Sequence, residues 1–144
     1  MAHDNCISFK TERFDYSSEL PAEYNAGNRF YGKDVAAYLC EQLAAAGLQA
    51  DYLDEDWGWL VLGESAPSTF FEIAIYNVSE GGEGGRPGAP EWGLWVRAFQ
   101  RGKKWGFIPS RTAIPISEAV LTAVRGAIKA LGSEPEDWRD GPCS

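Results

Sequence analysis

The sequence predicts a single α+β domain in which two helices cover one face of an antiparallel sheet. Two segments carry apolar residues at helical spacing, five or six shorter segments resemble strands, and successive middle strands are joined by connections that suit hairpins. The 144 residues suffice for a core, and 44% hydrophobic and 24% charged residues are typical of a globular domain. We therefore expect a two-layer sandwich over residues 1–132, with a sheet of five or six strands and a polar tail at 133–144.

The first third of the chain predicts a strand, a loop and a helix. Alternation of apolar and polar residues predicts a strand at 6–14, with Ile7 and Phe9 turned inward. Residues 15–29 have no such period and are expected to form an irregular loop. Apolar residues at helical spacing then predict a helix at 32–46, which a glycine follows as a natural end.

Three strands are expected after this helix. Residues 49–53 and 57–63 have strand character and are joined by an acidic turn at 54–56. Residues 70–78 alternate clearly between apolar and polar side chains. The next twelve residues, 79–90, are rich in glycine and proline and are expected to form a hairpin connection outside any regular element.

The last third predicts a hairpin and the second helix. A long strand is expected at 91–101, a tight turn at Gly102 and Lys103, and a short return strand at 105–108. Pro115 suits the first turn of a helix, whose apolar stripe ends at Leu131 before a glycine. The predicted order is therefore strand, helix, four strands, a further short strand and helix.

No residue pattern predicts catalysis, and no metal or cofactor is expected. The single histidine, His3, lies at the N-terminus, and neither a nucleophile elbow nor a P-loop is present. Cys6, Cys40 and Cys143 are odd in number and widely spaced, so we interpret them as reduced thiols of a cytoplasmic protein. The sequence has no signal-peptide pattern and no apolar run of about 20 residues, so no membrane partner is expected.

Charge is distributed unevenly along the chain. The net charge is −8, and residues 1–64 hold 12 acids and 4 bases, whereas residues 65–144 are balanced. An acidic total disfavours binding to a phosphate backbone, so no nucleic-acid partner is predicted. A basic stretch without acids between Glu91 and Glu118 does not reverse this. Its members are Arg97, Arg101, Lys103, Lys104 and Arg111.

The densest acidic group is Asp54, Glu55 and Asp56, with Trp57 beside it. Carboxylates gathered on a turn raise the local negative potential, and an adjacent tryptophan adds apolar contact area. We therefore predict that these four residues contact a basic protein partner. The simpler interpretation is a solvated acidic turn.

Aromatic residues are also expected on the sheet face away from the helices. If Leu94 and Val96 face the helices, Trp95 and Phe99 face away, and Tyr76 joins them by parity on the neighbouring strand. Either the loop at 15–29 or the C-terminal tail covers this face, or it is a partner-binding interface, where aromatic residues are enriched.

Two other functions fit the same residues. Trp57 and Trp59 with Glu64 or Glu72 would suit a carbohydrate-binding or glycoside-cleaving site, since two carboxylates flank the bond in such enzymes. A structural homodimer without a ligand is the third interpretation.

Residues 27–36, GNRFYGKDVA, followed by residues 55–59, EDWGW, resemble small single-domain bacterial proteins of uncharacterised function. Some proteins of this kind neutralise toxins in interbacterial competition. The resemblance implies a cytoplasmic, non-enzymatic, immunity-like protein. The predicted function is therefore a small acidic protein-binding module that occludes a basic surface of its partner.

Overall fold

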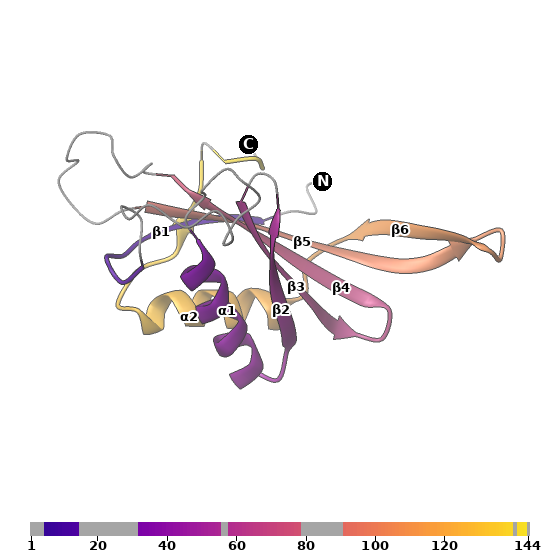
Figure 1. Ribbon diagram of the computed structural model, residues 1–144, viewed down its shortest axis with the longest axis horizontal. Helices are drawn as coiled ribbons and strands as arrows, with labels where there is room; N and C mark the ends of the chain where they lie inside the picture. Colours follow the sequence, from indigo (N-terminus) through magenta and orange to yellow (C-terminus); the bar gives the residue numbers. More distant parts are fainter. Residues whose placement is uncertain (1–4, 15–31, 56–57, 79–90, 140, 144) are drawn as a thin grey trace.

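The computed structural model describes residues 5–14, 32–55, 58–78, 91–139 and 141–143. These residues form two helices and a seven-stranded, fully antiparallel sheet, with both helices on one side of it (Figure 1). The predicted α+β sandwich and the order of its elements are confirmed. The seventh strand is a two-residue pairing in the C-terminal tail, too short to show as alternation in the sequence.

The elements follow one another along the chain as β1 Asn5–Lys10, α1 Lys33–Ala45, β2 Gln49–Glu55, β3 Gly58–Ala66, β4 Thr69–Asn77, β5 Glu91–Lys104, β6 Ile108–Ile114, α2 Glu118–Ala130 and β7 Glu136–Asp137. The strands lie in the order β2-β3-β4-β5-β1-β7, and β6 also pairs with β5. Strand β5 is long enough for two neighbours on one side. Its residues 91–96 pair with β1, and its residues 98–104 pair with β6.

The core lies between the helices and the sheet. Both helices contribute the apolar stripes that their spacing predicts, including the buried Leu39 of α1 and Val124 of α2. The Tyr38 hydroxyl donates a hydrogen bond of 2.6 Å to the carbonyl of Ala127, which ties α1 to α2. The sheet contributes Ile7, Phe9, Trp59, Val61, Phe71, Ile73, Ile75, Trp92, Leu94 and Val96.

The second helix begins later than Pro115. Ser117 is its N-cap, and the Ser117 hydroxyl accepts a hydrogen bond from the Val120 amide at 3.3 Å. This side-chain cap satisfies a backbone donor that Pro115 could not satisfy, so it fixes the start. Gly47 and Gly132 follow the helices with φ of 85° and 83°, as expected of helix-ending glycines.

Two predicted turns are wrong because the strand ladders continue through them. Gly102 and Lys103 pair with Ser110 and Pro109, so the hairpin turns at residues 105–107, where Trp105 and Gly106 have φ of 55° and 82°. Likewise Asp54 and Glu55 pair with Trp59 and Gly58 and belong to β2. Asp56, the last residue of the predicted acidic turn, lies outside the described residues, as does the glycine-rich connection at 79–90.

The prediction of three reduced thiols is wrong. Cys6 and Cys143 form a disulfide with an S–S distance of 2.04 Å, and Cys40 is the free cysteine. The two bonded residues are 137 positions apart, and only the return of the C-terminal tail across the sheet brings them together. Disulfides persist in oxidising compartments, so the cysteines no longer support a cytoplasmic location.

Candidate functional site

The C-terminal tail covers one half of the sheet face that lies away from the helices (Figure 1). The Trp138 amide donates to the Cys6 carbonyl at 3.1 Å, and the Trp138 indole packs directly over Gly93. A Cβ added at Gly93 would lie 2.6 Å from the indole, so only glycine permits this contact. The sequence left open whether the tail covers this face, and on this half it does.

Tyr76, a predicted partner-binding residue, lies at the border of the covered half. Its ring centroid is 5.5 Å from that of Trp138, and the residue is partly buried. Burial raises the pKa of the Tyr76 hydroxyl, and the positive charge of Arg97 partly opposes that shift. The ring of Tyr76 therefore contacts the docked tail through Trp138.

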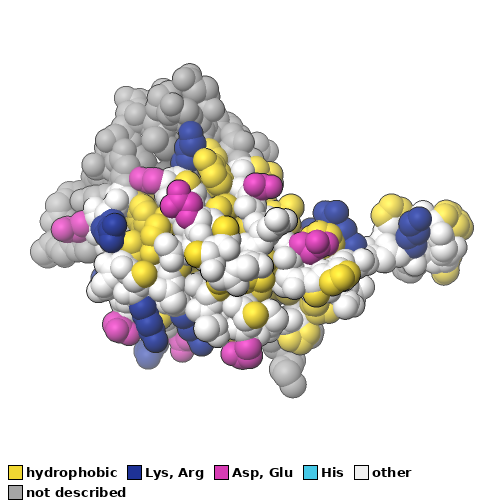
Figure 2. All heavy atoms as spheres, turned by 90° about the horizontal axis from the view of Figure 1, so that it is seen from below, with side chains coloured by type: hydrophobic (Ala, Val, Ile, Leu, Met, Phe, Trp, Pro, Cys, Tyr) yellow, Lys and Arg dark blue, Asp and Glu magenta, His cyan; other side chains and the backbone are white. Residues whose placement is uncertain are grey.

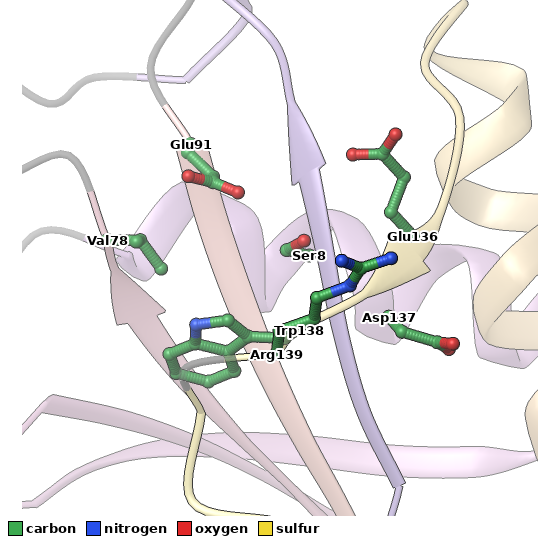
Figure 3. Close-up of a pocket in the computed structure, with 7 residues that line it drawn as sticks. All are labelled: Ser8, Val78, Glu91, Glu136, Asp137, Trp138 and Arg139. Carbon is green, nitrogen blue, oxygen red and sulfur yellow. The ribbon is translucent and has the colours of Figure 1, made fainter. Parts of the chain in front are cut away.

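A pocket of about 530 Å³ opens beside the tail (Figure 3). It is lined by Ser8, Val78, Glu91, Glu136, Asp137, Trp138 and Arg139. The carboxylate of Asp137 points away from those of Glu91 and Glu136, so the three acids do not converge on one point. Throughout the described part of the chain, no group of three or more His, Cys, Asp or Glu side chains is placed to hold a metal ion.

The other half of this face carries a cluster that we call the arginine–aromatic surface. Its members are Phe70, Glu72, Trp95, Arg97, Phe99, Arg101 and Arg111. Glu72 is 6% exposed and lies at the centre of the ion pairs. Arg97 Nη2 donates to Glu72 Oε2 at 2.9 Å, and Arg111 Nη2 donates to Glu72 Oε1. Two guanidinium groups thus compensate the charge of this buried carboxylate, and loss of either would leave that charge partly uncompensated.

The guanidinium groups also stack on aromatic rings. Arg97 lies 4.1 Å from the ring centroid of Trp95, and Arg111 lies 3.6 Å from that of Phe99. Such cation–π contacts hold flat, charged groups in fixed orientations. The surface therefore presents oriented arginines on a protein whose net charge is negative.

Phe99 is a predicted partner-binding residue that the structure buries. It is 2% exposed, because Phe70 stacks on it at 5.6 Å and Arg111 lies over its ring. Trp95, which points to the same face, is only partly buried. The parity prediction for both side chains is correct, but parity does not reveal that Arg111 of the neighbouring strand β6 covers the ring of Phe99.

The most exposed apolar side chains lie on a projecting hairpin that we call the hairpin arm, residues 101–111. The arm extends well beyond the body of the domain, and Figure 2 shows apolar and basic side chains gathered at its end. Trp105 is 76% exposed, Phe107 72% and Ile108 38%. Beyond the pair Thr69 and Gln100, the arm consists of β5 and β6 alone within the described chain.

Sequence reasoning missed this arm. The signal was present as Trp-Gly-Phe, flanked by two lysines on one side and Ile-Pro on the other. Gly106 marks the turn, and a turn places its neighbours at the surface. The sequence pattern instead favours a turn at the earlier glycine, Gly102, and therefore predicts that Trp105 lies in a strand.

The other predicted site residues lie on β2 and β3 or outside the described residues. Asp54 and Glu55 are paired in β2, whereas Asp56 and Trp57 lie outside the described residues. Trp59 is 4% exposed and belongs to the core, so it offers no platform to a sugar. Glu64 is exposed and lines a pocket of about 540 Å³ with Asp51, Leu62, Phe70 and Arg101, among others.

No helix in the described residues combines the length and hydropathy needed to cross a membrane. Comparison of the chain with family models, with curated proteins and with solved structures found no match.

Proposed function

We propose that this protein is a non-catalytic protein-binding module whose anchor is the tip of the hairpin arm. The observation that carries this proposal is the exposure of Trp105 and Phe107, at 76% and 72%, two positions apart at the turn of a projecting hairpin. Folded domains bury most of their large aromatic side chains, and tryptophan is among the residues most enriched in binding hot spots. Two such side chains on one turn form a compact anchor for a pocket on a partner.

The charges along the arm, from its base at Arg101 and Arg111 towards the tip at Lys103, favour an acidic partner. Arg101, Lys103 and Arg111 are exposed on the arm, and the sequence holds no acid between Glu91 and Glu118. Opposite charges speed association and fix orientation more than they add affinity. We therefore infer an apolar pocket rimmed by carboxylates on the partner. This revises the sequence-based prediction, which placed the contact on acidic residues and the basic charge on the partner.

The apolar area at the tip is large enough to anchor a complex. An exposed fraction of 76% corresponds to roughly 150 Å² of Trp105, and burying it contributes about 4 kcal/mol before the costs of association. Phe107 adds a comparable contribution. The mechanism is occlusion, in which the arm fills a pocket on the partner without any chemical step.

A second candidate keeps the predicted basic partner and the implied immunity-like role. Strand β2 is an edge strand that carries exposed Asp51, and Tyr52 and Leu53 are 38% and 39% exposed. The test is a triple change of Asp54 to Asn, Glu55 to Gln and Asp56 to Asn. Association with a basic partner should slow several-fold at low salt while the fold stays intact. An unchanged rate and salt dependence would remove this candidate.

The leading proposal is tested by affinity measurements on a partner identified by capture and mass spectrometry. Trp105→Ala and Phe107→Ala should each weaken binding by about 30-fold or more, the range of a hot-spot residue. Tyr52→Ala, an exposed aromatic residue on the opposite edge of the sheet, is the matched control and should bind as the wild type does. Full affinity in both tip variants would overturn the proposal.

A further inference from the structure

We propose that the outer edge of β6 receives an extended acidic segment of the partner as an added β-strand. The inference rests on the proposed function, because it specifies how a protein partner is held once the arm has engaged it. Strand addition to a free edge is a common mode of peptide recognition, in which backbone hydrogen bonds give affinity and side chains give specificity. Strand β6 suits this mode by its register, its charge and its single strand neighbour within the described chain.

The register shows which backbone groups of β6 point outward. In an antiparallel pair, residues alternate between positions that bond to the partner strand and positions whose N–H and C=O point away from it. Pro109 has no N–H, so its pair with Lys103 is of the second type. The Arg101 amide donates to the Ser68 carbonyl at 3.0 Å, away from β6, which makes the pair of Arg101 and Arg111 of the second type as well.

The N–H and C=O groups of Arg111 and Ala113 therefore point away from β5. Within the described chain, β6 has β5 as its only strand neighbour, so these groups form an open edge. An incoming strand can bond to Arg111 and Ala113 without disturbing the pairing of β6 with β5. The outward-pointing groups are two residues apart along β6, which is the spacing at which an antiparallel strand forms its hydrogen bonds.

Charge distinguishes this edge from β2, the edge strand on the opposite side of the sheet. Arg97, Arg101, Lys103 and Arg111 all point to the face away from the helices, and Glu72 compensates only part of their charge. Strand β2, at the opposite edge, carries Asp51, Asp54 and Glu55. An acidic segment is therefore attracted to β6 and repelled from β2.

The alternation of a strand fixes where the acids of the segment should lie. Residues directly opposite each other in adjacent strands have Cβ atoms about 4.5–5.5 Å apart, and opposite charges at such positions stabilise the pair. An acidic residue opposite Arg111 would share its face with the arginine–aromatic surface. We therefore infer a segment with Asp or Glu at alternate positions.

The arm also gains stability from a third strand. Residues 101–104 and 108–111 form a two-stranded ribbon. Such ribbons are only marginally stable by themselves, whereas a sheet of three strands with an apolar face can be stable. The added strand would thus hold the arm rigid and orient Trp105 and Phe107 towards the partner.

The test uses short capped peptides and amide hydrogen exchange. The probe peptide alternates glutamate and valine, and the control peptide alternates lysine and valine. The glutamate peptide should slow exchange of the Arg111 and Ala113 amides by about tenfold or more, while the Thr112 amide, which bonds to β5, should not change. Protection by both peptides, or protection of β2 instead, would overturn the inference.

Two variants sharpen the result. Ala113→Pro removes an outward donor and should weaken peptide binding by about two- to tenfold, the equivalent of one backbone hydrogen bond, while the matched change Ala113→Ser should not. N-methylation of the peptide at alternate residues leaves the protein untouched. Methylation of the peptide amides that face β6 should abolish binding, whereas methylation of the intervening amides should not. Equal effects of the two methylation patterns would overturn strand addition.

The outcomes separate this inference from the proposed function. Loss of affinity in Trp105→Ala together with normal peptide binding would support both statements. Full partner affinity in both tip variants would overturn the tip as anchor and leave strand addition standing. Heparin at the same total negative charge as the peptide serves as a polyanion control. If heparin displaces the peptide, and the peptide does not protect the Arg111 and Ala113 amides, the edge binds polyanions in general and the inference is overturned.

Discussion

Replacing Cys143 by Ser removes the cross-link between the two ends of the described chain, and its cost can be worked out from the fold. The disulfide joins residues 137 positions apart, so it closes nearly the whole chain into a loop. In the chain-entropy account, a loop of this length stabilises the folded state by about 5 kcal/mol at 25 °C. For a domain of this size we expect the melting temperature to fall by about 10–20 °C.

The assay is guanidinium unfolding of the oxidised wild type, the reduced wild type and Cys143→Ser. The reduced protein and the variant should share a lower midpoint, because each lacks the same constraint on the unfolded chain. Cys40→Ala is the control for loss of a thiol: it keeps the disulfide, so reductant should lower its midpoint by as much as it lowers that of the wild type. Alkylation under denaturing conditions should modify one cysteine before reduction and three afterwards.

A midpoint that is the same with and without reductant would refute this reasoning. It would mean either that the cross-link does not form or that the unfolded chain loses no freedom to it. The number of alkylated cysteines tells the two apart.

Three other changes test the core, the docked tail and the free thiol. Gly93→Ala should lower the unfolding free energy by about 1–3 kcal/mol by displacing Trp138, whereas Gly102→Ala, whose added Cβ meets only a hydroxyl at 3.5 Å, should change it little; denaturant midpoints decide both. Leu39→Ala should cost about 2–5 kcal/mol through lost burial and a cavity, and an unchanged midpoint would place Leu39 outside the core. Burial first, and then the charge of Asp51, raises the pKa of Cys40 from 9.0 to about 11, so the folded state holds this proton longer than the unfolded state does. The contribution of the Cys40 thiol to the free energy of unfolding should therefore fall as pH rises from 9.0 towards 11. Alkylation of Cys40 at pH 9.0 should be slower in the native protein than in the unfolded chain, and equal rates would contradict the raised pKa.

The sequence predicted what local periodicity controls. Leu39 and Val124 repeat with the helical period, and Trp95 and Phe99 alternate with the strand period, so their elements and faces could be assigned. The helix ends at Gly47 and Gly132 also have local causes. Such features depend on residues within a few positions, and a single sequence contains them.

The missed features depend on residues far apart in the chain. The burial of Phe99 requires Arg111 from another strand, and the disulfide requires the tail to return across β1. The length of the hairpin arm depends on pairing beyond Gly102, which looks like a turn residue because it is a glycine followed by lysines. Local pattern alone could not separate Gly102 from Gly106, since the choice is made by the register of the entire ladder.

The backbone at Trp105 adds weight to the proposed function. Its φ of 55° lies in the left-handed region, which costs an L-residue about 1–2 kcal/mol and which turns usually fill with Gly, Asn or Asp. The side chain is 76% exposed, so the fold recovers little of that cost by burying the indole. Non-glycine residues in this region of φ and ψ are found preferentially at functional sites. A partner pocket that buried the indole of Trp105 would add a favourable term to this strained turn, in line with the proposed function.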